Sequence, residues 1–373
     1  MKIFRYFVFI FFVIALDAKN LPSPVRGIYL NPYSCSNARR IASIVDSMKK
    51  YKLNTVVIDV KADNGKIPFK TKNPLLGRAA YPIYNLDSIV SYFHRNNILL
   101  IGRIVTFKDP IRARMNGGEY AVLDKFTSRP WQDSGGAYWV DPYNIDNWDY
   151  NIEVAREVLK RGFDSVQFDY VRFPSDGNIG LCKYPGYQKG YYYSDIIAMF
   201  AHYAKFKLKD YDIGIDVFGY LPWLKRIINI GQDMSMITAQ VDIVSPMLYP
   251  SHFGDKFLLK NGDYFKRTYD IIRGSLIKAQ KYTSKGQRII PFLQSFTYKQ
   301  SKMGKFYVEN QINAAISVGD GSYYVWNAGS NYSLLWKALN NLNSMESTGR
   351  AMNYIKLKEY LFNETSRHRD QRI

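Results

Sequence analysis

The chain has 373 residues, of which 47% are hydrophobic and 22% are charged, so it can bury one large core or two ordinary ones and is not a disordered polymer. Lysine and arginine (51) outnumber aspartate and glutamate (32), which gives a formal charge of +19. Because the basic residues are interrupted rather than clustered, the charge favours a lysine-rich surface over a nucleic-acid-binding face. An anionic polymer of the cell envelope remains open as a partner.

Residues 1–18 have the pattern of a bacterial secretory signal peptide. Lys2 and Arg5 precede an apolar run of about a dozen residues, which is the length of a signal-peptide core and too short for a comfortable membrane span. We expect cleavage after Ala18, a mature protein that begins near Lys19, and export to the periplasm or beyond the cell. Without cleavage the segment would act as an N-terminal anchor; after cleavage no stable membrane span is expected.

Beyond the signal, strand-like apolar runs alternate with helical patterns. The predicted strands are 25–30, 55–60, 98–105, the first half of 163–177, 212–219, 242–249, 288–296 and 322–328. The predicted helices are 37–53, 86–97, 147–162, 194–210, 263–281, 307–318 and 333–343.

This alternation predicts an α/β protein with parallel strand pairing. Eight such units over about 300 residues fit a single (β/α)8 TIM barrel across residues 25–340, with loop insertions after the third and fourth strands. An open doubly wound sheet is the alternative, but no predicted strand is followed by a glycine-rich phosphate loop. Residues 341–373 read as a charged C-terminal tail.

Aspartates stand near the ends of three predicted strands: Asp59 on the second, Asp169 on the fourth and Asp216 on the fifth. The C-terminal strand ends of such a barrel line its active site, and neighbouring strands lie about 4.8 Å apart. The alternation along 163–177 directs Gln167 and Asp169 into the barrel. We therefore expect Asp169 and Asp216 to face each other.

Two facing carboxyl groups are what glycosidic cleavage requires. We expect Asp169 to act as the nucleophile or base and Asp216 as the general acid, and neighbouring strands favour the short carboxyl separation of a retaining enzyme. The structural alternative is that these aspartates cap loops or pair with Arg103, Arg172 or Lys61. Many barrel glycosidases use a glutamate as the acid, and none stands at a predicted strand end here.

Other polar and aromatic residues at the predicted strand ends suit a sugar site, because aromatic faces stack on pyranose rings and polar groups bind hydroxyls. The candidate substrate-binding residues are Asp59, Tyr29, Arg103, Gln167, Arg172, Tyr249, Gln294, Trp326 and Asn327. Asp141, which precedes Pro142, is interpreted instead as a loop brace.

The chain contains four histidines and two cysteines, all scattered, so we expect no metal and no cofactor. Cys35 and Cys182 can form a disulfide only if the long loop after the fourth strand folds across the barrel mouth. Bridging needs Cα atoms within about 7 Å, so free thiols are the expected outcome.

Several segments taken in order resemble a bacterial family described as a putative glycosyl hydrolase domain. They are IDVKADNG, IGRIVTFKDP, YWVDPYN with WDYN, GFDSVQFDYVRFPSDG, GIDVFGY and VSPMLYPSHF, within a resemblance that runs from Val25 to Asn340. The QFDYVRFPSDG element is the specific one. The resemblance implies a TIM barrel related to glycoside hydrolases, with Asp169 as the first catalytic candidate, Asp216 as its partner and Asp59 in support. Ala62 departs from the family pattern, where a second acidic residue is frequent.

Together these features predict an exported glycoside hydrolase that cleaves a polysaccharide or envelope glycan with a pair of aspartates. Two other functions remain open. One is a non-catalytic carbohydrate-binding barrel that uses the same aromatic residues, and the other is an envelope scaffold protein that uses its positive surface.

Overall fold

The computed structural model describes residues 21–298 and 303–347. The predicted signal peptide at 1–18 and most of the predicted tail at 341–373 lie outside the described residues. The last helix, α10 (Ser333–Ser347), extends past the boundary predicted at residue 340.

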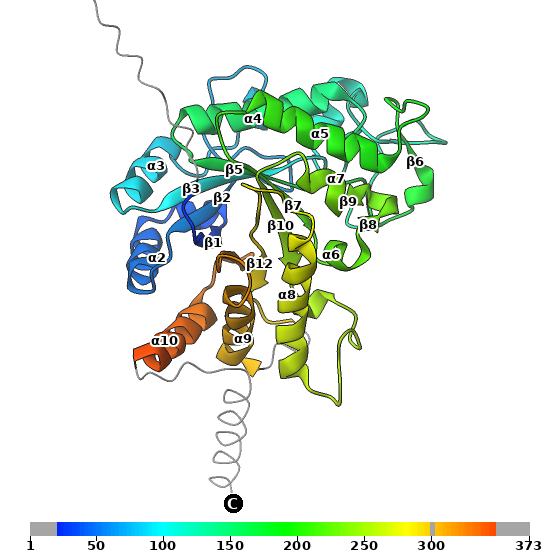
Figure 1. The fold of residues 1–373 in the computed structure, drawn as a ribbon. Helices are drawn as coiled ribbons and strands as arrows, with labels where there is room; N and C mark the ends of the chain where they lie inside the picture. Colours follow the sequence, from blue (N-terminus) through cyan, green and yellow to red (C-terminus); the bar gives the residue numbers. More distant parts are fainter. Residues whose placement is uncertain (1–20, 299–302, 348–373) are drawn as a thin grey trace, which may run out of the picture.

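The described chain forms a closed barrel of parallel strands, which confirms the predicted (β/α)8 fold (Figure 1). Around the barrel the strands are β1 (Arg26–Leu30), β2 (Thr55–Lys61), β3 (Leu99–Val105), β5 (Ser165–Asp169), β7 (Ile213–Phe218), β10 (Ile243–Leu248), β11 (Arg288–Ile289) with β12 (Phe292–Gln294), and β13 (Tyr323–Trp326). β11 and β12 together occupy one strand position of the barrel, since both pair with β10. Pro291 lies between them and has no N–H to donate to the ladder.

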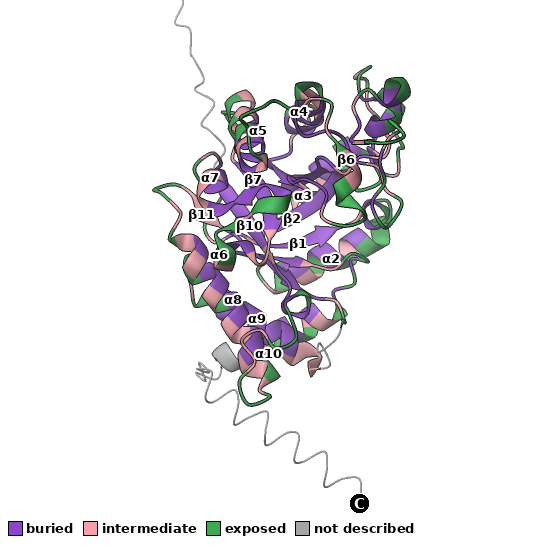
Figure 2. Ribbon diagram, turned by 90° about the vertical axis from the view of Figure 1, so that its right-hand side faces the viewer, coloured by how far each residue is buried: buried purple, intermediate pink, exposed green. Residues whose placement is uncertain are grey.

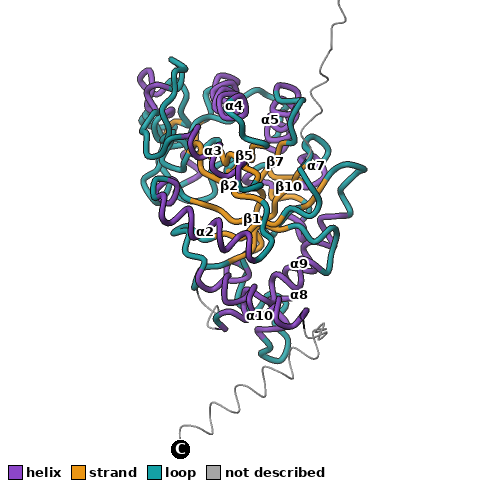
Figure 3. Tube along the Cα trace, turned by 90° about the vertical axis from the view of Figure 1, so that its left-hand side faces the viewer, coloured by secondary structure: helices purple, strands orange, loops and turns teal. Residues whose placement is uncertain are grey.

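Helices surround the barrel, as Figures 1 and 3 show. The main ones are α2 (Ala38–Lys50), α3 (Leu86–Arg95), α4 (Ile145–Lys160), α5 (Tyr193–Lys207), α8 (Tyr264–Gln280), α9 (Lys305–Ile316) and α10. The shorter ones are α1 (Pro32–Cys35), α6 (Leu221–Leu224) and α7 (Met234–Thr238). Among these described residues no helix is long and apolar enough to cross a membrane.

Strand alternation sorts the side chains into two cores. Outward-facing residues such as Val166, Phe168 and Ile215 pack against the helices, whereas Val57 and Ile101 belong to a smaller cluster inside the barrel. Figure 2 shows the strands as the most continuously buried part of the molecule. The inner cluster fills the part of the barrel nearer the amino ends of the strands. The polar residues farther along the strands therefore lie at the carboxyl end of the barrel.

The crossover between β7 and β10 differs from the sequence analysis, which assigned nothing to residues 220–241. It holds α6, a small hairpin of β8 (Arg226–Ile227) and β9 (Gln232–Asp233), and then α7. These elements are two to five residues long, too short to produce a recognisable hydrophobic period.

Two long connections, between β3 and α4 and between β5 and α5, contact each other through an antiparallel pair of β4 (Leu123–Asp124) and β6 (Cys182–Lys183). Asp141 acts as a brace between them, as predicted: it accepts hydrogen bonds from Tyr143 N at 2.9 Å and Gly186 N at 2.7 Å. Cys35 and Cys182 are both free thiols.

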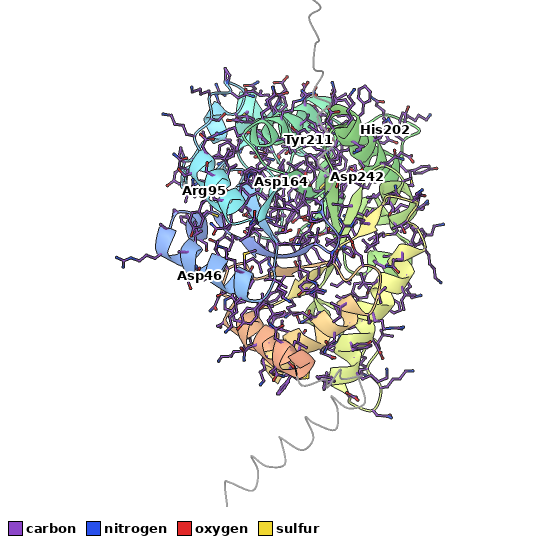
Figure 4. All side chains as sticks on the ribbon, turned by 60° about the vertical axis from the view of Figure 1, so that its left-hand side comes forward. Asp46, Arg95, Asp164, His202, Tyr211 and Asp242 are labelled. Atoms are coloured by element: carbon purple, nitrogen blue, oxygen red, sulfur yellow. The ribbon has the colours of Figure 1, made fainter. Side chains whose placement is uncertain are left out.

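Aspartates at the amino ends of the strands serve the backbone. Asp164 accepts a hydrogen bond from Leu100 N and Asp242 accepts one from Ile213 N, each at 2.9 Å. Both are labelled in Figure 4. They tie each strand start to its neighbour, which distinguishes them from the aspartates at the opposite end of the barrel.

Candidate active site

Strand register brings the predicted acidic residues together at the carboxyl end of β2, β3, β5 and β7. Asp59 is aligned with Arg103, and Arg103 with Gln167. Asp169 and Asp216 are the residues that follow the last aligned pair of β5 and β7, and both side chains point into the barrel because their neighbours pack outward. All five candidates therefore lie in two successive layers of the barrel interior.

Arg103 joins two of the three aspartates. Its Nη1 lies 2.7 Å from Asp59 Oδ1, while Nη2 and Nε lie 2.5 Å and 3.0 Å from Asp169 Oδ2. The Tyr29 hydroxyl donates to Asp59 Oδ2 at 2.8 Å, and the Tyr170 N–H donates to Asp169 Oδ1 at 2.6 Å. The alternative of pairing with Arg103 thus holds for Asp59 and Asp169, and it fixes both carboxylates in place.

Asp216 is different, because it is buried and has no ion-pair partner in the described part of the chain. Among the described residues none donates a hydrogen bond to its Oδ1. Burial raises the pKa of Asp216 well above its ordinary value, and repulsion from Asp169 adds to this rise. Arg103 and the nearby Gln167 amide oppose the rise, although neither polar atom of Gln167 completes a hydrogen bond. The protonated form of Asp216 is therefore favoured.

The pKa of Asp59 is subject to opposing effects. Burial raises its pKa, whereas Arg103 and the Tyr29 hydroxyl lower it. Its backbone carbonyl also accepts a hydrogen bond from the Tyr84 hydroxyl at 3.1 Å. Asp59 is held as a support for Arg103 and offers no free oxygen toward the mouth.

Aromatic residues form one wall of the site. The rings of Tyr29 and Trp326 stack with centroids 3.8 Å apart, and the Arg103 guanidinium lies 4.9 Å from the Trp326 ring. Tyr249 follows β10, and the pKa of its hydroxyl is raised well above the usual value by burial and by the charges of Asp169 and Asp216. The Tyr249 ring belongs to the apolar cluster inside the barrel.

Arg172 does not reach the carboxyl pair. Its guanidinium lies 4.8–4.9 Å from the ring centroids of Trp139, Tyr170 and Phe218. It also donates hydrogen bonds to Phe173 O and Ser175 Oγ. Arg172 therefore holds the loop after β5 rather than presenting its charge to a substrate.

Gln294 and Asn327 are also committed to protein partners. Gln294 Oε1 accepts from Ser251 Oγ at 2.9 Å and from Tyr307 OH at 3.0 Å, and its amide donates to Phe296 O. Asn327 donates to Ser295 O at 2.6 Å and accepts from two backbone N–H groups of its own loop. Their side chains position loops at the mouth.

Two residues of the site were not predicted. Ser245 on β10 is aligned with Asp216, and its buried hydroxyl has no hydrogen-bond partner among the described residues. The inward alternation of 242–249 could have revealed it. Tyr170 has a φ of 52°, the left-handed region that a bulky residue rarely adopts, and this turn aims its N–H at Asp169. No sequence pattern signals that conformation.

No cluster of three metal-binding side chains occurs within residues 21–298 and 303–347. The polar groups around Asp169 and Asp216 are instead carboxyl, guanidinium, amide and phenol. That set can donate and accept protons and bind hydroxyl groups.

The family model described as "Putative glycosyl hydrolase domain" matches residues 27–332. A search of curated proteins gives no match. Among solved structures, a hypothetical protein from Ruminiclostridium thermocellum ATCC 27405 is 34% identical over 51% of this chain and 97% of its own, with a TM-score of 0.48.

Two more distant structures share the fold over most of the chain. The glycoside hydrolase domain of PgaB (BpsB) from Bordetella bronchiseptica has a TM-score of 0.61 and 12% identity, covering 86% of this chain and 98% of its own. The α-galactosidase TtGalA from Thermus thermophilus has a TM-score of 0.51 and 9% identity, covering 87% and 62%. At these identities the likeness shows a common fold.

Proposed function

The chain belongs to the family of the putative glycosyl hydrolase domain, and from this membership and the geometry of its barrel mouth we propose that it cleaves glycosidic bonds with Asp216 as the general acid and Asp169 as the nucleophile. The observation that carries the proposal is the unequal environment of the two carboxyl groups. Asp169 is fixed by Arg103, whereas Asp216 is buried with a raised pKa and forms no ion pair with any residue that the structure describes. Such a difference separates the acid from the nucleophile.

Charge counting supports these roles. Arg103 carries one positive charge and contacts two carboxylates, Asp59 and Asp169, so the trio has a net charge of about −1. Ionising Asp216 would place a second uncompensated negative charge in the same buried space. The trio therefore favours the protonated form of Asp216.

In the proposed reaction, Asp216 donates its proton to the glycosidic oxygen as the bond from that oxygen to the anomeric carbon breaks. Asp169 Oδ1, which among the described residues accepts a hydrogen bond only from the Tyr170 N–H, bonds to the anomeric carbon. Water then attacks that carbon, loses a proton to the Asp216 carboxylate, and releases Asp169. Tyr249 and the stacked pair of Tyr29 and Trp326 are proposed to orient the sugar.

The test is a screen of purified protein against envelope polysaccharides that measures new reducing ends. Hydrolysis by the native protein and its loss in Asp169→Asn and Asp216→Asn support the proposal. Unchanged hydrolysis by either variant contradicts the assigned roles. The second candidate, a non-catalytic carbohydrate-binding barrel, is favoured by the ion pair that engages Asp169; it predicts retention of polysaccharide by the native protein without any reducing ends.

We also propose that the protein is exported and acts on a glycan of the bacterial envelope. The support is the charged and then apolar pattern of residues 1–18 and the excess of basic residues, which suits an anionic wall polymer. N-terminal sequencing of the protein recovered from the periplasm or medium is expected to begin near Lys19. A chain that still begins at Met1 would support an anchor instead.

A further inference from the structure

A hollow lies on the surface, and none of its lining residues belongs to the carboxyl pair or the Arg103 trio. It encloses about 470 Å³ and is lined mainly by five tyrosines, Tyr143, Tyr187 and Tyr191 to Tyr193, with Arg226 and Asn229 beside them. We call it the tyrosine hollow. The proposed reaction uses none of these residues.

Its aromatic rings are unusually exposed. The exposed fractions of Tyr192, Tyr187 and Tyr191 are 79%, 57% and 44%, and that of the adjacent Ile228 is 77%. A concave cluster of exposed rings is a recurring feature of binding sites, whereas single exposed aromatics are ordinary.

The back of the hollow is rigid. The Tyr193 ring stacks on Phe173 with centroids 3.8 Å apart and an interplanar angle of 8°. Tyr143 packs edge-on against Tyr187 at 5.4 Å, and its hydroxyl donates to Tyr191 O. The rings of Tyr143, Tyr187 and Tyr193 are therefore positioned before any ligand arrives, which reduces the entropy that binding must overcome.

Polar groups at the rim are available for hydrogen bonds. Arg226 Nε pairs with Asp233 at 2.6 Å, but its terminal nitrogens make no hydrogen bond to the described residues, and neither does the Asn229 amide. Aromatic faces combined with guanidinium and amide donors are complementary to a pyranose ring, which has apolar C–H faces and a polar edge.

The tyrosine hollow lies on the same rim as the carboxyl pair. Its residues come from the connections that follow β3, β5 and β7, the strands that carry Arg103, Asp169 and Asp216. Phe173, the ring beneath Tyr193, is four residues after Asp169, so their backbones are at most about 14 Å apart. Phe173 N also donates to Ile230 O, which ties this loop to the β8–β9 segment.

We propose that the tyrosine hollow is an accessory sugar-binding subsite that holds pyranose units of the same polysaccharide chain whose linkage is cut at Asp169 and Asp216. The inference rests on the proposed function for the identity of the ligand. Its consequence is a preference for long chains over short ones, because only a polymer occupies the hollow and the carboxyl pair together.

The test measures binding without turnover. Affinity gels compare two proteins: the Asp216→Asn variant, and the same variant that also carries Tyr187→Ala and Tyr192→Ala. The gels contain chitosan, soluble starch, galactan or solubilised glycan strands of peptidoglycan. The double alanine change is expected to weaken retention about 10- to 30-fold for the polymer that binds, since each ring contributes about 1 kcal/mol. Tyr192→Phe should retain binding. Phe206 on α5 has an exposed fraction of 67%, between those of Tyr187 and Tyr192, so Phe206→Ala is the matched control and should have no effect.

Kinetics separate this inference from the proposed function. In the active protein the double alanine change should raise KM for the polymer and leave kcat on a short aryl glycoside unchanged. Equal retention with and without the two tyrosines, or no retention of any polymer, overturns the subsite whether or not hydrolysis is seen. If the native protein hydrolyses nothing but the tyrosine-dependent retention remains, the proposed reaction fails and the subsite stands.

Discussion

Asp216 depends for its proposed role on keeping its proton, so its ionisation should set the alkaline limit of activity. Its pKa is raised by burial and by Asp169, and the group is active as an acid only below that pKa. We expect kcat to be high on the acidic side and to fall as pH rises through this pKa. Asp216→Asn should lower kcat by about 10²- to 10⁴-fold and remove the alkaline limb.

A pH–rate profile of both proteins checks this prediction, on an aryl glycoside whose poor leaving group requires protonation as the glycosidic bond breaks. An unchanged alkaline limb in the variant would assign the limb to another group.

Arg103 neutralises part of the negative charge at the mouth, and its removal should be costly for folding. Arg103→Met leaves Asp59 and Asp169 buried without their cation, which typically costs about 3–5 kcal/mol. Arg103→Lys keeps the charge but cannot contact both carboxylates with the same geometry, so we expect a smaller loss. Thermal unfolding of the two variants measures the difference. Equal Tm values for native protein and Arg103→Met would contradict a structural role for the trio.

Among the strands, β5 and β7 determine the stereochemistry of the proposed reaction. Phe168 is aligned with Ile215, so Asp169 and Asp216 follow on neighbouring strands. Neighbouring strands about 4.8 Å apart favour the carboxyl separation of about 5–5.5 Å that retaining enzymes use. We expect retention of the anomeric configuration. Proton NMR of the first product formed checks this, and initial release of the opposite anomer would indicate inversion.

Asp141 links the β3–α4 and β5–α5 connections, and its contribution to the stability of the fold should depend on pH. Burial raises the pKa of Asp141 from 3.8 to about 6, so the folded state binds more protons than the unfolded state between these values. Its contribution to stability is therefore largest below about pH 4 and is lost as pH rises through 6, with a total change of about 2–3 kcal/mol. Asp141→Asn cannot titrate.

The measurement is the Tm of native protein and Asp141→Asn at pH 4, 5, 6 and 7. The native protein should exceed the variant by more at pH 4 than at pH 7. A gap that is constant across this range would mean that Asp141 does not titrate between pH 4 and 7.

Residues 21–25 close the amino end of the barrel and should contribute to the stability of the whole molecule. Leu21 N donates to Asp212 Oδ2, Arg288 donates to the carbonyls of Leu21 and Pro22, and Val25 is fully buried in the inner core. A chain that starts at Arg26 should be less stable than one that starts at Lys19 by roughly 3 kcal/mol or more, because two buried apolar side chains are lost. Denaturant unfolding of the two proteins tests this; equal midpoints would show that the segment only covers the barrel.

Local patterns in the sequence predicted the barrel and directed Asp59, Asp169 and Asp216 to one end of it. They succeeded because alternation and helical periodicity are properties of neighbouring residues, and the parallel order of the strands fixes which ends meet. The same method failed at residues 220–241, where each element is too short to show a period. The last helix was predicted at 333–343, and the structure extends α10 to Ser347.

Side-chain partners far apart in the sequence were decided only by the tertiary structure. Arg103 lies 44 residues from Asp59 and 66 from Asp169, and only the register of β2, β3 and β5 shows that one cation serves both. Gln294 had the composition and place of a sugar ligand, yet its hydrogen bonds are used by Ser251 and Tyr307.

The tyrosine hollow likewise depends on the tertiary structure. Each of its tyrosines is visible in the sequence, but the hollow exists only because connections after β3, β5 and β7 fold against one another. Periodicity tells which way a side chain points from its own strand or helix. Which groups it meets depends on strand register and loop packing, and these are set by the closure of the whole barrel.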